Sequence, residues 1–124
     1  MQKWLMLLAG GICGTAGRYL LSGFVYQWYG LKFPYGTLAV NGLGCLIIGF
    51  IATLADQKLL LSPEARMFWI VGLLGAFTTF SALIYESWQL WQHGDFLLAI
   101  VNLQGSLILG LGAFWIGHVI ALLV

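Results

Sequence analysis

Four long apolar segments separated by short polar ones constrain this chain more than any other feature of its sequence. They are residues 4–29, 35–55, 66–91 and 96–123, and the last contains no Asp, Glu, Lys or Arg. A helix needs about 20 apolar residues to cross the hydrocarbon core of a bilayer. We therefore expect an all-α integral membrane protein, with four transmembrane helices forming a single domain over residues 1–124.

Composition excludes several other classes of protein. Hydrophobic residues make up 61% of the 124 residues and charged residues only 7%. A soluble domain of this size keeps much of its surface wet and could not hide so much apolar area. The net charge is +1 and no basic stripe occurs, so we expect no nucleic-acid partner. No Cys–His pair, Ser–His–Asp set or metal-ligand spacing indicates an enzyme.

The distribution of Lys and Arg bears on orientation. With four spans, one side of the membrane holds Lys3, Lys58 and Arg66, and the other holds Lys32 and, near a helix end, Arg18. This is a weak positive-inside bias, and a chain with weak bias can insert in both orientations. Two oppositely inserted copies can then pair about a two-fold axis in the membrane plane. We expect a dual-topology antiparallel dimer.

The densest polar cluster inside an apolar segment is Gly72–Ser81, which has two glycines and three hydroxyl side chains at mid-membrane depth. Two interpretations stay open. A continuous helix could pack through its glycines and bond its hydroxyls to its own carbonyls. Alternatively, the helix is broken near Gly75–Thr79, which frees carbonyls for a cation and N–H groups for an anion. We expect the third helix to be broken near its middle.

The other intramembrane polar groups are mostly hydrogen-bond donors. Asn41 offers two N–H groups, Ser106 offers one O–H, and aromatic rings have positive edges. Such a set, without a fixed cation, suits a small and strongly hydrated anion. Arg18 is expected to be structural, snorkelling or pairing with helix-end carbonyls. Glu86 lies on the same helical face as Thr79. There its carboxylate either lines a vestibule or is hydrogen-bonded near the membrane interface.

Four motifs of this chain occur in the same order as in a known family. Gly10–Tyr19 resembles the opening motif of the Fluc (CrcB-type) fluoride channels, and Gly36–Gly44 resembles their second-helix motif. Gly72–Ser81 resembles their third-helix break, and Asn102–Ser106 resembles a fourth-helix motif. The resemblance covers the whole chain. It implies a fluoride-selective channel in the inner (plasma) membrane that exports fluoride passively and relieves fluoride toxicity.

The resemblance also implies roles for particular positions. The family forms dual-topology homodimers with two fluoride pores, each lined by both subunits. The backbone carbonyls of Gly75 and Thr78 match positions that hold a structural sodium ion, and Arg18 matches the first-helix arginine. The positions that match the pore and its vestibule are Asn41, Thr79, Phe80, Ser106 and Glu86, with Leu83 at a further pore position.

Two positions depart from the family pattern. Leu83 stands where a second phenylalanine is expected, and Gly110 replaces a hydroxyl one turn beyond Ser106. Leucine keeps the bulk but lacks the ring edge. Slower conduction and pairing with a different homologue that restores one pore both stay open, so the partner is a second copy or a homologous chain.

Two other functions are compatible with a small membrane protein of four helices. A small dual-topology multidrug exporter needs a carboxylate in its first helix to exchange protons for a cationic drug, whereas residues 4–29 contain Arg18 and no Asp or Glu. A non-conducting partner subunit would not need so many hydroxyls in Gly72–Ser81. We therefore expect a fluoride channel.

Overall fold

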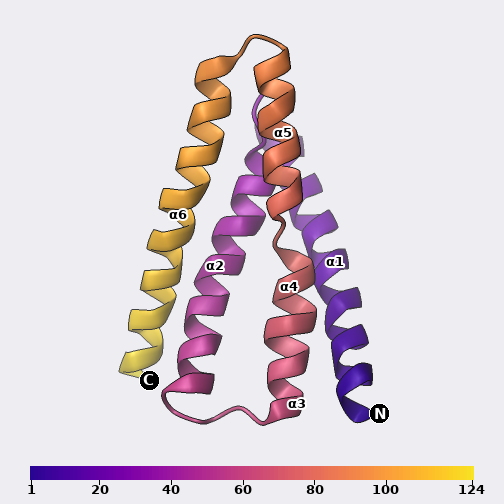
Figure 1. The fold of residues 1–124 in the computed structure, drawn as a ribbon, viewed down its shortest axis with the longest axis vertical. Coiled ribbons are helices and arrows are strands. Elements are labelled where there is room, and N and C mark those ends of the chain that lie inside the picture. Colours follow the sequence, from indigo (N-terminus) through magenta and orange to yellow (C-terminus); the bar gives the residue numbers. More distant parts are fainter.

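The computed structural model describes all residues, 1–124, as four long helical segments (Figure 1). They are α1 (Gln2–Tyr29), α2 (Tyr35–Asp56), a composite third segment (Pro63–Gln92) and α6 (Phe96–Leu123). Each is long and apolar enough to cross a membrane. The prediction of four long apolar helices is confirmed, and the chain is a multi-pass membrane protein. Both termini and the α2–α3 loop lie at one end of the molecule, and the α5–α6 turn lies at the other (Figure 1).

The third segment is built from four pieces. It begins at Pro63 rather than near Arg66, because the Ser62 side chain accepts a hydrogen bond from the Ala65 N–H (3.2 Å) and proline suits a first turn. A π-helical stretch follows, which nothing in the sequence predicts; such stretches often occur at functional sites. The pieces are α3 (Pro63–Arg66), η1 (Met67–Leu74), α4 (Gly75–Phe77) and α5 (Phe80–Gln92).

Between α4 and α5 the backbone is extended. Thr78 has φ −79° and ψ 154°, and Thr79 has φ −148° and ψ 114°. The Thr79 hydroxyl accepts a hydrogen bond from the Ala82 N–H (3.2 Å), so Thr79 is the N-cap of α5. Figure 1 shows this two-residue interruption as a short coil in the middle of the third segment. We call it the break.

Close helix contacts are made through glycine. A Cβ at Gly14 in α1 would meet the carbonyl of Leu73, and a Cβ at Gly117 in α6 would lie 2.9 Å from the backbone N of Phe50 in α2. Only glycine permits such backbone approach, which strengthens helix packing in lipid. Only 22 of the 124 residues are buried, so most apolar side chains point away from the chain, as they would toward lipid or another subunit.

Candidate functional site

The site begins at the break, which is held by a side chain from another helix. The Nδ2 group of Asn41 donates to the Thr79 carbonyl (3.0 Å), and the Thr79 N–H donates to Asn41 Oδ1 (2.8 Å). One amide of α2 therefore satisfies two backbone groups that an unbroken helix would have satisfied itself. Of the two N–H groups expected from Asn41, one is used here and one remains for a ligand.

The break also changes two backbone carbonyls. In a continuous α-helix the Thr79 N–H would bond to the Gly75 carbonyl, and the Ala82 N–H would bond to the Thr78 carbonyl. Both N–H groups instead bond to side chains, those of Asn41 and Thr79. The carbonyls of Gly75 and Thr78 thus lose their usual intrahelical donors. The Thr78 hydroxyl turns back and donates to the Leu74 carbonyl (2.9 Å).

A cavity of about 320 Å3, here called the break cavity, lies beside this segment. Ser106 is buried and its Oγ has no hydrogen-bond partner within the chain. Leu83 is 5% exposed, whereas Phe80 is 72% exposed. The structure therefore brings together most of the residues named from the sequence, from α2, the break, α5 and α6. Those that line the break cavity are Asn41, Thr78, Thr79, Phe80, Leu83 and Ser106.

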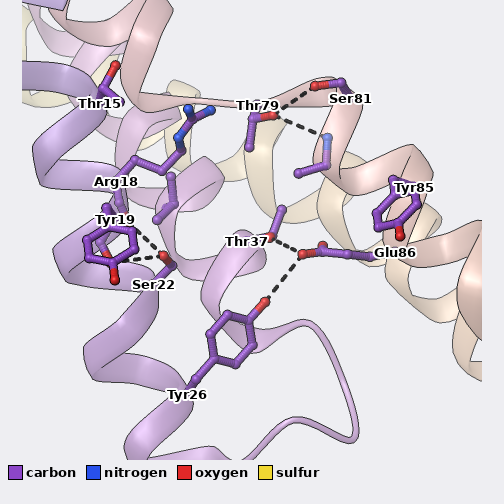
Figure 2. A pocket seen from close by; sticks show the side chains of 12 residues that line it. Thr15, Arg18, Tyr19, Ser22, Tyr26, Thr37, Thr79, Ser81, Tyr85 and Glu86 are labelled. Atoms are coloured by element: carbon purple, nitrogen blue, oxygen red, sulfur yellow. Dashed lines mark hydrogen bonds between the residues drawn. The ribbon is translucent and has the colours of Figure 1, made fainter. Parts of the chain in front are cut away.

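Two of the remaining residues, Arg18 and Glu86, line a second cavity of about 580 Å3, here called the polar cavity (Figure 2). Thr79 lines both cavities and so stands between them. The guanidinium of Arg18 forms no hydrogen bond or ion pair within the chain. Figure 2 shows it reaching from α1 into the cavity, on the side where Thr79 lies. Gly75 lines neither cavity; it lies in a third one between α1 and η1.

Glu86 joins three helices at the far end of the polar cavity. Its Oε1 accepts hydrogen bonds from the Thr37 hydroxyl (2.7 Å) and the Tyr26 hydroxyl (3.3 Å), while its buried Oε2 has no partner. Sequence reasoning missed Tyr26. The only signal was an aromatic residue near a helix end, which is typical of any membrane interface.

Asn102 is a second amide inside the helix bundle and, unlike the half-buried Asn41, is fully enclosed. Its Nδ2 group donates to Ser87 Oγ (2.9 Å), and the Ser87 hydroxyl donates to the Leu83 carbonyl (2.7 Å). This connection ties α6 to α5 behind the break cavity. Asn102 Oδ1, like Ser106 Oγ, has no partner, so α6 presents two unsatisfied polar atoms one turn apart.

Fold and site together define a class: a multi-pass membrane protein whose interrupted helix adjoins cavities that carry hydrogen-bond donors. Residues 5–118 match the family described as "CrcB-like protein, Camphor Resistance (CrcB)", and this chain belongs to that family. Among its relatives, proteins named "Fluoride-specific ion channel FluC" from Opitutus terrae and Nitrosococcus oceani are 45% and 42% identical. The matches cover 98% and 97% of this chain, and 93% and 96% of the relatives. A relative of the same name from Desulforapulum autotrophicum is 43% identical over 99% of this chain and 98% of its own length. Membership of this family, whose named relatives are ion channels, confirms that the chain is not an enzyme.

Proposed function

We propose that this chain is a subunit of a fluoride-selective channel in the inner (plasma) membrane, where it lets fluoride leave the cell passively. Its relatives carry that activity in their name. The observation that carries the proposal is the break cavity, where donors from three helical segments converge and no Lys or Arg is present.

The donors suit a small anion. Asn41 has one N–H beyond those that hold the break, and the buried Ser106 hydroxyl has no partner within the chain. Neutral N–H and O–H groups replace part of the water around fluoride. Because no Lys or Arg side chain lines the cavity, the ion is bound weakly enough to leave again. Phe80 adds a positive ring edge at the open side of the cavity.

The pore needs a second subunit in this proposal. Phe80 lines the break cavity and is nevertheless 72% exposed, so a single chain leaves this side of the site uncovered. An oppositely inserted copy would cover it, and two such pores would lie on either side of a two-fold axis. Leu83, which supplies no ring edge, favours one alternative: this chain is a non-conducting partner subunit that pairs with a homologous chain in a heteromeric channel.

A sodium ion at the centre of the dimer is part of the same proposal. The carbonyls of Gly75 and Thr78 fit this role, because the N–H groups that would bond to them in a continuous helix are bonded elsewhere. Carbonyl oxygens freed by a helix break are suitable ligands for a monovalent cation. When bound, sodium would supply one fixed positive charge that holds the two breaks together.

The test is ion efflux from liposomes that contain only this protein. Fluoride efflux should greatly exceed chloride efflux, and equal rates would contradict the proposal. Absence of both, with fluoride efflux restored by a co-purified homologue, would favour the partner-subunit alternative. Accessibility of a C-terminal reporter from both sides of the membrane tests the antiparallel homodimer, which a single orientation in cells would exclude.

A further inference from the structure

A fourth cavity opens beyond Glu86, toward the loop between α1 and α2. This outer cleft has a volume of about 480 Å3. Its lining includes Lys32 from the loop and His93 and Asp95 from the α5–α6 turn. It shares only two lining residues with the polar cavity, and these are Tyr26 and Glu86. The two side chains therefore form the wall between the outer cleft and the polar cavity.

The two halves of this wall are held with unequal strength. Thr37 is buried and its short hydrogen bond (2.7 Å) anchors Glu86 to α2. The hydrogen bond from Tyr26 is longer (3.3 Å) and joins α1 to α5 across the wall. A long, half-buried hydrogen bond is the weaker of the two. The contact between Tyr26 and Glu86 is thus the weaker connection in the wall.

The Tyr26 ring packs directly against the backbone at Gly36. A Cβ at Gly36 would lie 2.5 Å from Tyr26 Cε2 and 2.7 Å from Tyr26 Cζ. The ring consequently lies against the backbone of α2, and its hydroxyl points across to Glu86 (Figure 2). Any side chain at Gly36 would displace the ring from this position, so the absence of a side chain there is what lets Tyr26 pack against α2.

From this arrangement we propose that Tyr26 controls access to the polar cavity, with its ring as the barrier and its hydroxyl as the latch that holds Glu86 across the passage. Dissolved ions and small polar molecules in the outer cleft then reach Thr79 only when the contact between Tyr26 and Glu86 breaks. Tyr26 is a positioning residue that acts through Glu86. The inference rests on the proposed function only in taking this passage as the ion path.

The test measures entry into the polar cavity directly. Ser22 lines this cavity but not the outer cleft, so Ser22→Cys in a background with Cys13→Ala and Cys45→Ala serves as the reporter. The probe is a membrane-impermeant, negatively charged methanethiosulfonate added to proteoliposomes, where lipid or a second subunit covers the other sides of the cavity. The rate of modification reports how often the wall is open.

Tyr26→Phe keeps the barrier and removes the latch, and we expect it to raise the modification rate up to about tenfold, the effect of one net hydrogen bond. Tyr26→Ala removes both, so its rate should rise further. Tyr19→Phe is the matched control, because Tyr19 lines the same cavity and forms no hydrogen bond through its hydroxyl; its rate should stay unchanged.

Unchanged rates in both Tyr26 variants, in protein that elutes as the parent does, would overturn the proposal. This readout does not require fluoride transport. A parent protein that passes no fluoride would therefore defeat the proposed function while leaving the access test intact. In a conducting parent, modification of the Ser22→Cys reporter should abolish fluoride efflux. Undiminished efflux from fully modified protein would show that the polar cavity is not on the ion path.

Discussion

The amide of Asn41 and the backbone of Thr79 are joined by two hydrogen bonds of 3.0 Å and 2.8 Å, although 38 residues separate them in the sequence. Together they replace what the break removes from the third segment. The same amide thus holds the interruption open and lines the break cavity. In the proposed channel, this one residue would both support the break and contact the ion.

Replacement of Asn41 should therefore affect folding as well as flux. Asn41→Leu leaves the Thr79 N–H and carbonyl without partners in an apolar setting, which costs about 1–3 kcal/mol for each group. Unfolding in detergent, followed by the loss of the native elution peak on heating, should show a clear drop in midpoint. Gln104→Leu is the control, since Gln104 is exposed and forms no hydrogen bond through its side chain. Equal midpoints for the two variants would contradict the role assigned to Asn41.

Phe80 and Leu83 differ in exposure, so substitutions at these positions can test whether an aromatic ring edge contributes to fluoride flux. Phe80 is largely exposed, so Phe80→Leu should leave the fold of the single chain intact while strongly reducing fluoride flux per folded protein. Leu83 is buried, but it lines the break cavity, which has room for part of a larger ring. Leu83→Phe should preserve or raise the flux. Near-normal flux in Phe80→Leu would leave Asn41 and the hydroxyls as the only ion contacts.

The sodium proposal predicts that backbone oxygen, not a hydroxyl, is the ligand. Thr78→Ala removes a hydroxyl that only bonds back to the Leu74 carbonyl, so the sodium dependence of dimer stability should remain. Gly75→Ala has room within one chain, because its Cβ would meet only the Ile70 carbonyl, at 3.7 Å. A loss of dimer in Gly75→Ala would hence place another subunit at this position. The measurement is thermal stability in sodium against potassium, and loss of the difference in Thr78→Ala would refute backbone ligation.

Ser87 and Asn102 form a buried pair suited to a double-mutant cycle. Ser87→Ala should destabilise the protein by about 1–3 kcal/mol, because it strips the partner from a fully enclosed amide. The double variant Ser87→Ala/Asn102→Leu should be less destabilised than the sum of the two single variants, since no polar group is then left unpaired. Denaturant titration of all four proteins measures the coupling. Strict additivity would mean that the hydrogen bond contributes nothing.

Glycines that look alike in the sequence should respond very differently to alanine. Gly117→Ala sets a methyl group against the backbone of Leu46 and Phe50, so α2 and α6 must separate. Gly112→Ala, five residues earlier on the same helix, meets nothing within 4 Å and gains helix propensity. Yield of folded protein should fall sharply in the first variant and not in the second. Similar yields would show that α6 does not approach α2 as described.

The sequence alone determined the four long apolar segments, because the hydropathy of a segment is a local property and sets how favourably that segment partitions into lipid. It also named the polar residues of the break cavity, Asn41, Thr78, Thr79 and Ser106, since polar groups are rare in apolar helices and each is costly. Phe80 and Leu83 were named only from the resemblance to the family. The residues of Gly72–Ser81 are compatible with both a continuous and a broken helix. The sequence carried no sign of the π-helical stretch before the break.

Tertiary structure decided how these polar groups are paired. The donor that satisfies Thr79 comes from α2, and Tyr26 meets Glu86 across 60 residues of sequence. Such pairings depend on the rotation and depth of each helix relative to its neighbours. Glycine contacts such as those at Gly14 and Gly117 set that packing, and local sequence does not encode its register. The separation of Arg18 and Glu86 from the break cavity follows from the same packing.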